Sequence, residues 1–201
     1  MSGFGISIYL PKKLNDDLSS KLEKFFEDEY HATQNLKFKN RKRIKERILN
    51  GRWEILFETN NIVIIEYEII NNNFPFDEET EFEYLQIKEY LGNFPEGILN
   101  VTSGINISRK FPNETYNLIS KLTELTKGFV NIQSGLSYFV NKPENSENID
   151  TINEIFNSIK NLKGQKMEIV SYSIQETQVH HLLDYEFLKE WKKDKNFYYL
   201  F

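Results

Sequence analysis

The chain has 201 residues, of which 39% are apolar and 14% aromatic, and its formal net charge is −5. This apolar content excludes a disordered chain, and the absence of cysteine excludes disulfide scaffolds, thiolate zinc sites, iron–sulfur clusters and cysteine nucleophiles. We recognise no signal peptide and no run of about 18 apolar residues, so we expect a protein of the cytoplasm.

The first half of the chain predicts the order β-α-β-β-α-β. Residues 4–10 alternate apolar and small or polar side chains, which is typical of a half-buried strand, and Asn15 can cap the helix that follows. Residues 53–57 and 62–70 predict a hairpin, in which Glu66 and Glu68 would face outward. A helix over residues 80–91 and a strand over 98–101 complete this half.

A basic segment interrupts this half and carries eight cationic residues and one acid, Glu46. The spacing of Ile44 and Ile48, followed by Asn50-Gly51, predicts a short exposed helix. Such a helix could bind RNA phosphate, an anionic membrane or an acidic protein, or it could simply be solvated. The cationic residues are Lys37, Lys39, Arg41, Lys42, Arg43, Lys45, Arg47 and Arg52.

The second half of the chain predicts nearly the same order of elements. A strand over residues 105–111 precedes a helix that ends at Gly128, and residues 129–132 and 136–140 predict a second hairpin. A helix over 152–159 and a last strand over 167–174 follow. A C-terminal helix is expected around residues 185–191.

A faint internal repeat organises these elements. Gly5-Ile6-Ser7-Ile8 and a later Ser-Lys-Leu reappear as Gly104-Ile105-Asn106-Ile107 and a second Ser-Lys-Leu. We therefore predict an α+β fold of two tandem ferredoxin-like β-α-β-β-α-β units, residues 1–103 and 104–201, packed into one body with a C-terminal helix. The alternative is one mixed α+β domain whose halves look alike because short β-α segments often do.

The histidines are the residues to weigh first for metal binding. If residues 176–184 were helical, Glu176, His180 and Asp184 would share one face and could hold zinc or manganese; the alternative is a polar linker in which His180 or His181 packs or caps. Similarly, His31 follows Glu27 and Asp28, but a helix-terminal histidine favoured by the helix dipole explains that spacing as well. We assign no metal, no cofactor and no catalytic residue.

The sequence also lacks the signatures of several enzyme classes. It contains no glycine-rich phosphate loop, no G-x-S-x-G nucleophile elbow and no H-E-x-x-H motif. Paired carboxylates are frequent, but nothing in the sequence places two of them across a cleft, so we interpret them as solvated faces.

The overall character resembles that of small bacterial immunity proteins that neutralise polymorphic or contact-delivered toxins. The resemblance lies in the acidic, cysteine-free α/β character and in stretches such as Leu118-Ile119-Ser120-Lys121-Leu122, which leads through Lys127-Gly128 into Phe129-Val130-Asn131-Ile132. The resemblance implies a stoichiometric binder without catalytic residues.

Charge suggests where such a binder would act. Outside residues 37–52 the chain holds 17 basic and 29 acidic residues, a net charge of −12, which suits a cationic protein partner and not nucleic acid. The predicted partner-binding residues are Phe74, Phe76, Asp77, Glu78, Glu79, Glu81 and Glu83. One alternative is a small-molecule-binding or enzymatic cleft between the halves, lined by Tyr67, Tyr84, Glu66 and Glu68; another is an RNA-binding module that uses residues 37–52.

Overall fold

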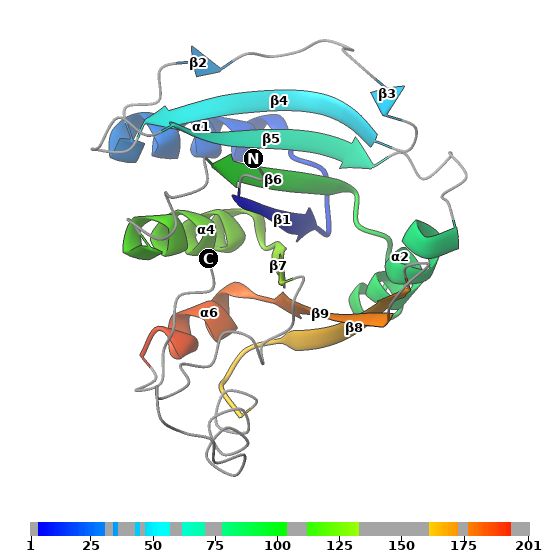
Figure 1. Ribbon diagram of the computed structural model, residues 1–201. Coiled ribbons are helices and arrows are strands. Elements are labelled where there is room, and N and C mark those ends of the chain that lie inside the picture. The colour runs from blue at the N-terminus through cyan, green and yellow to red at the C-terminus, as the bar shows by residue number, and fades with distance from the viewer. Residues whose placement is uncertain are drawn as a thin grey trace.

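The computed structural model describes residues 4–30, 34–35, 43–44, 47–56, 62–70, 78–103, 112–132, 161–172 and 177–193. Its helices are interspersed among the strands along the chain (Figure 1). In chain order they are β1 (Phe4–Leu10), α1 (Asp16–Tyr30), β2 (Gln34–Asn35), β3 (Arg43–Ile44), β4 (Arg47–Leu56), β5 (Ile62–Ile70), α2 (Glu78–Leu91), β6 (Gly97–Ser103), α4 (Pro112–Thr126), β7 (Phe129–Ile132), β8 (Lys166–Tyr172), β9 (Thr177–Leu183) and α6 (Tyr185–Trp191).

The described strands form one antiparallel sheet. Its order is β2-β4-β5-β6-β1-β7-β9-β8, and β3 pairs separately with β4. The two halves of the chain meet at its centre, where Ser7 of β1 lies opposite Asn131 of β7. The predicted α+β class is therefore confirmed, and strands from both halves belong to the same sheet.

The predicted pair of ferredoxin-like units is not confirmed. Such a unit needs parallel strands on either side of a crossover helix, but β6 is an antiparallel neighbour of both β5 and β1. Helix α2 therefore connects two adjacent antiparallel strands and does not form a β-α-β crossover. The sheet also contains more strands than one such unit would have.

Helix boundaries follow local capping chemistry. The side chain of Asn15 accepts a hydrogen bond from the backbone N–H of Leu18 (2.8 Å), as expected for the residue that caps α1. Similarly, Asp184 caps α6 by accepting from the backbone N–H of Phe187 (2.8 Å). The predicted C-terminal helix over residues 185–191 is confirmed.

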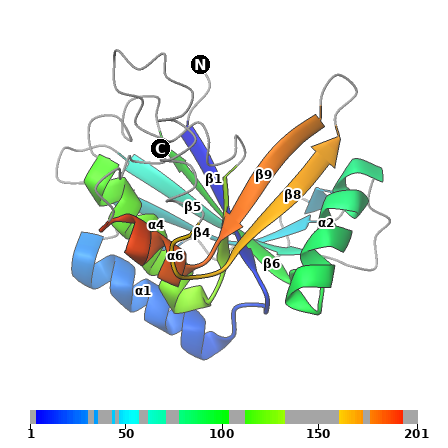
Figure 2. The same cartoon turned by 90° about the horizontal axis from the view of Figure 1, so that it is seen from below.

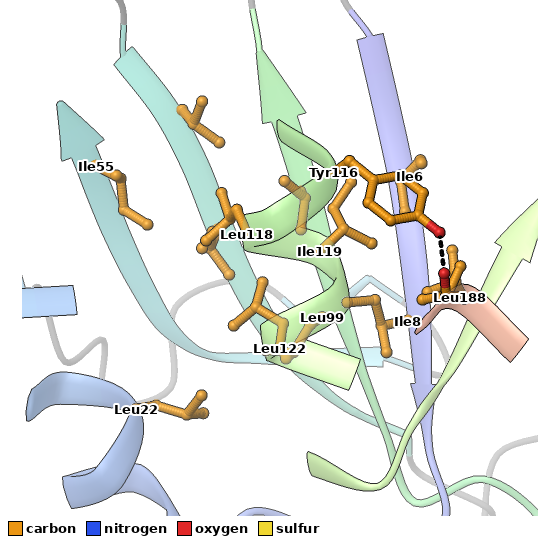
Figure 3. Packing of buried hydrophobic residues seen from close by; sticks show 14 of the residues in the cluster. Ile6, Ile8, Leu22, Ile55, Leu99, Tyr116, Leu118, Ile119, Leu122 and Leu188 are labelled. Atoms are coloured by element: carbon orange, nitrogen blue, oxygen red, sulfur yellow. Dashed lines mark hydrogen bonds between the residues drawn. The ribbon is translucent and has the colours of Figure 1, made fainter. Parts of the chain in front are cut away.

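One face of the sheet is covered by three helices, α1, α4 and α6, which lie together in Figure 2. We call this the covered face. Alternate residues of β1 point into it, so that Ile6, Ile8 and Leu10 are buried against Leu122 of α4 and other apolar side chains (Figure 3). The Tyr116 hydroxyl of α4 donates to the backbone carbonyl of Leu188 in α6, which joins two of the covering helices.

The opposite face, which we call the second face, has a different cover. At one end α2 buries Tyr84 and Ile87 in an apolar cluster that includes Tyr9 of β1 and Ile98 of β6. Figures 1 and 2 both place α2 beside β8, apart from the three helices of the covered face. The next positions along β1 and β6 on this face, beyond the cluster, are polar.

Two sequence predictions are wrong in the described part of the chain. The basic segment does not form a helix there, because Arg43–Ile44 pairs with Arg47–Ile48 as neighbouring strands. Asn50-Gly51, interpreted as a helix stop, lies inside β4 beside an irregularity in its pairing with β5. In addition, residues 177–183 form β9, a strand between β7 and β8 that we did not predict.

Other predictions fall partly or wholly outside the described residues. They include the strand over 105–111, the hairpin strand over 136–140 and the helix over 152–159. The predicted pairing of the strands near residues 53–57 and 62–70 is confirmed by β4 and β5, which are in register from Leu56–Ile62 to Gly51–Tyr67. Among the described helices, none combines the length and apolarity that crossing a bilayer requires.

Candidate partner-binding surface

Helix α2 exposes more apolar surface than the other described elements. The large apolar side chains that remain exposed in the described residues are Phe82, Leu85 and Tyr90, at 38%, 47% and 41%, and all three belong to α2. Since the helical repeat brings positions i, i+3 and i+7 to one side, Phe82 and Leu85 share a face with the exposed Glu89. We call Glu81, Phe82, Leu85 and Glu89 the outer stripe of α2.

Contacts on the inner side of α2 fix which residues face outward. Tyr84 and Ile87 are fully buried, and the Tyr84 ring packs edge-on against Tyr9 at 6.0 Å between centroids. The Tyr9 hydroxyl donates to Glu83 Oε1 (2.8 Å). On the next side, the Gln86 amide bonds to the backbone of β8. The helix is therefore held in one rotation about its axis.

The charge of α2 is strongly negative. Its 14 residues include five glutamates and one cation, Lys88. The Lys88 ammonium lies over the Phe94 ring, 4.6 Å from its centroid, beside the outer stripe. The stripe thus combines two large apolar side chains with two exposed carboxylates, Glu81 and Glu89.

The structure places the predicted partner-binding residues in four different situations. Phe74, Phe76 and Asp77 lie outside the described residues, and Glu78 and Glu79 form the first turn of α2. Glu81 is exposed on the outer stripe. Glu83, in contrast, faces the sheet and accepts the hydrogen bond from Tyr9, so its carboxylate is already engaged within the molecule.

Sequence reasoning missed the apolar half of this surface. We grouped Phe82 and Leu85 with Tyr84 and Ile87 as support for one helix. The helical period separates them, because Tyr84, Ile87 and Leu91 are spaced i, i+3 and i+7 on the inner side. That spacing was the available signal.

A row of polar residues crosses the second face of the sheet. Directly opposed positions on five neighbouring strands carry Arg52, Glu66, Asn100, Ser7 and Asn131, which we call the polar row. The Ser7 hydroxyl donates to Asn100 Oδ1 (2.9 Å). Asn131 is only 4% exposed, and its Oδ1 accepts no hydrogen bond from the part of the chain that the structure describes.

One cation of the predicted basic segment, Arg52, belongs to the polar row. Arg52 is 31% exposed and its guanidinium contacts Glu54 Oε1 (3.2 Å) and Glu66 Oε1 (3.6 Å). Its charge is therefore balanced within the sheet. Arg43 and Arg47 lie on β3 and β4, and the remaining predicted cations, Lys37, Lys39, Arg41, Lys42 and Lys45, lie outside the described residues.

The cleft suggested for Tyr67, Tyr84, Glu66 and Glu68 is not formed by these residues. Tyr67 points into the covered face, where its hydroxyl accepts from the backbone N–H of Leu14 (3.0 Å), while its neighbours Glu66 and Glu68 point to the second face. Glu68, which we expected to face solvent, is 8% exposed. Tyr84 is buried under α2.

The candidate histidine site is also not assembled. His180 and His181 are consecutive residues of strand β9, so their side chains point to opposite faces. His181 Nε2 lies 3.4 Å from Glu168 Oε1 of β8, and Asp184 caps α6 instead of sharing a helical face with His180. Glu176 and His31 lie outside the described residues. Within the described ranges, no three histidine or carboxylate side chains gather as metal ligands.

Comparison with known proteins adds a family assignment. The sequence profile of a family of unknown function, DUF6368, matches residues 2–200. Neither the curated proteins nor the solved structures gave a match.

Proposed function

The chain belongs to the family of unknown function DUF6368, and we propose that it is a non-enzymatic protein-binding module that uses the outer stripe of α2 to dock a cationic partner. In this proposal the partner is a basic toxin or effector, which the chain occludes as an immunity protein does. The observation that carries the proposal is the exposure of Phe82 and Leu85 beside Glu81 and Glu89, on a helix whose inner side is packed against the sheet.

Apolar anchors supply the affinity in this proposal. Binding interfaces typically draw most of their free energy from a few large side chains that become desolvated at the centre. Phe82 and Leu85 are one helical turn apart and are both more than one-third exposed, so a partner can bury both at once. The flanking carboxylates would then form the rim.

In this proposal, charge determines which partners the surface attracts and how fast they associate. Outside residues 37–52, the chain carries 29 acidic and 17 basic residues, a net charge of −12, and α2 alone has five glutamates and one lysine. A negative surface attracts a basic protein at long range and speeds encounter, particularly at low salt. Pre-organisation of α2 by Tyr9–Glu83 and by Gln86 limits the ordering cost of binding.

The proposal can be tested with the proteins encoded by the genes that flank this chain's own gene. Each is purified and titrated against the immobilised chain. We expect one basic product to bind, and a Phe82→Ser/Leu85→Ser variant to weaken its binding at least 30-fold, corresponding to about 2 kcal/mol or more for anchor residues. We also expect this partner to arrest growth when it is expressed alone in a bacterial host, and growth to recover when the chain is co-expressed.

Matched charge reversals separate the stripe from general electrostatics. Glu81→Lys/Glu89→Lys changes the stripe, whereas Glu27→Lys/Asp28→Lys makes the same change in net charge at exposed positions of α1. We expect the first variant to slow association at low salt at least tenfold and the second to change it less than twofold. The proposal is wrong if no flanking product binds. It is also wrong if the Glu81→Lys/Glu89→Lys variant binds the partner as well as the Glu27→Lys/Asp28→Lys variant does.

A further inference from the structure

Asn131 differs from the other members of the polar row, because it is almost completely buried. Its neighbour Val130 belongs to the apolar cluster of the covered face, so the alternation of β7 turns Asn131 to the second face, opposite Ser7 of β1. Among the described residues, none donates a hydrogen bond to Asn131 Oδ1. A buried acceptor without a donor costs free energy, and a ligand that donates to this oxygen would recover that cost.

The polar row continues from Asn131 with further acceptor groups. The Ser7 hydroxyl donates its proton to Asn100 Oδ1 (2.9 Å), so the Ser7 oxygen keeps its capacity to accept. Glu66 of β5 lies directly opposite Asn100, on the next strand. Ser7, Asn100 and Glu66 are all half-buried. Since neighbouring strands are about 4.8 Å apart, these acceptors follow one another over about 14 Å from Asn131 to Glu66.

The polar row borders solvent on the side away from α2. The next pair of residues on that side of β1 and β6 is Gly5 and Thr102, which are both exposed. Gly5 lies two residues before Ser7 and therefore belongs to the same face. A Cβ added to Gly5 would meet Thr102 Cγ2 at 3.8 Å, which is an ordinary contact. The sheet thus has room for a side chain beside Ser7, and Gly5 leaves that position open.

Carboxylates outnumber cations where β4 and β5 cross the second face. Arg52 contacts both Glu54 Oε1 (3.2 Å) and Glu66 Oε1 (3.6 Å), so one guanidinium is shared between two carboxylates. Glu68, two residues along β5 from Glu66, adds a third carboxylate to the same face. This excess of negative charge disfavours an anionic ligand and favours a cation.

We propose that the polar row binds a small organic cation with several N–H donors, a polyamine, of which one ammonium group donates to Asn131 Oδ1. An ammonium group has three donors and no acceptor, which complements a row of acceptors. Hydrogen bonds from a charged donor are also stronger than those between neutral groups. The other ammonium groups extend along the row toward Glu66. This inference concerns the sheet face and is independent of the docking role of the outer stripe.

Titration calorimetry at low salt, with spermidine as the probe, tests the proposal. Asn131→Leu removes the acceptor, Gly5→Val adds a strand-favouring side chain beside Ser7, and Gln165→Leu replaces an exposed amide outside the row as the control. None of the three variants changes the net charge, so general attraction of a polycation to the chain stays the same. We expect both row variants to weaken spermidine binding at least tenfold, and the control to match the parent.

A second comparison separates charge from shape. Putrescine and 1,4-butanediol have the same carbon chain, but only putrescine carries ammonium groups, so we expect putrescine to bind more tightly by at least tenfold. Urea denaturation of each variant shows that it is folded under the conditions of the titration. The inference is overturned if the parent does not bind spermidine, if the diol binds as tightly as putrescine, or if either folded row variant binds spermidine as well as the parent does.

Discussion

The two faces of the sheet differ in polarity and in the helices that cover them. The covered face is apolar from β4 to β9 and lies under α1, α4 and α6. On the second face, the described buried apolar residues cluster with those of α2, and the polar row crosses the face from Arg52 to Asn131. Since apolar burial stabilises the fold and unsatisfied polar burial opposes it, the covered face accounts for stability.

The contrast directs the search for function to the second face and its helix. Antiparallel sheets commonly leave one face in water, so polarity alone on the second face is ordinary. The exposure of Phe82 and Leu85 on the helix of that face is less ordinary, because a stable helix usually turns such side chains inward. The functional proposal therefore concerns α2, and the polar row sets the boundary of the apolar cluster.

Consecutive residues of β1 give the largest expected difference between the faces. Ile8 is fully buried in the covered face, so Ile8→Ala should lower the free energy of unfolding by about 2–5 kcal/mol. Ser7 points to the second face and loses one hydrogen bond in Ser7→Ala, which should cost about 1 kcal/mol. Urea denaturation of both variants checks this, and equal losses would contradict the division into two faces.

Gly128 joins the covering layer to the sheet, and its replacement should have the next largest effect. A Cβ at this position would lie 2.7 Å from Ile8 Cγ2 and 2.9 Å from the backbone oxygen of Tyr9. Gly128→Ala should therefore lower the free energy of unfolding by about 1–3 kcal/mol, because β1 and β7 must separate slightly. Gly92→Ala is the contrasting variant, since it meets no atom within 4 Å and is strained only by its φ of +79°. A thermal midpoint unchanged by Gly128→Ala would show that the covering helices do not pack closely against the sheet at this position.

Local patterns predicted the elements that depend on local chemistry. Asn15 indicated the start of α1, and the Tyr185–Trp191 helix was identified over its observed bounds. The apolar and polar alternation over residues 62–70 likewise indicated β5 and the burial of Val63 and Ile65, although it wrongly placed Glu68 in solvent. In these segments propensity, periodicity and capping agree with the tertiary structure.

The failures concern pairing between distant segments. Ile44 and Ile48 have helical spacing, but Ile48 pairs with Arg43 of the neighbouring strand, and this pairing decides the structure. The strand β9 contains His180-His181 and lacks clear alternation, so its position between β7 and β8 is set by both neighbours. The strand order likewise depends on contacts that no local pattern records, whereas the spacing of Tyr84, Ile87 and Leu91 did indicate the inner side of α2.

Asn131 offers a test in which removing polarity should not destabilise the chain. Its Oδ1 is buried without a hydrogen bond, which costs free energy unless a binding partner uses it. Asn131→Leu keeps a similar volume, so we expect the free energy of unfolding to stay equal or rise by up to about 1 kcal/mol. Chemical denaturation checks this. A loss greater than 1 kcal/mol would show that the Asn131 amide stabilises the sheet, as the apolar residues of the covered face do.

The smallest effect is expected at alkaline pH, at the end of α1. Burial, followed by the nearby charges of Glu29 and Glu114, raises the pKa of Tyr30 to about 12. Its ionised form is disfavoured in the folded state, so this contribution to stability is complete below the unfolded pKa of about 10 and is lost as the pH rises toward 12. Spectrophotometric titration at 295 nm should lose a component near pH 12 in Tyr30→Phe, and stability should then fall less between pH 9 and pH 11. Glu29→Gln removes one of the charges and should lower the pKa of Tyr30. If the component lost in Tyr30→Phe lay near pH 10, and Glu29→Gln left the titration unchanged, Tyr30 would ionise as an ordinary surface phenol.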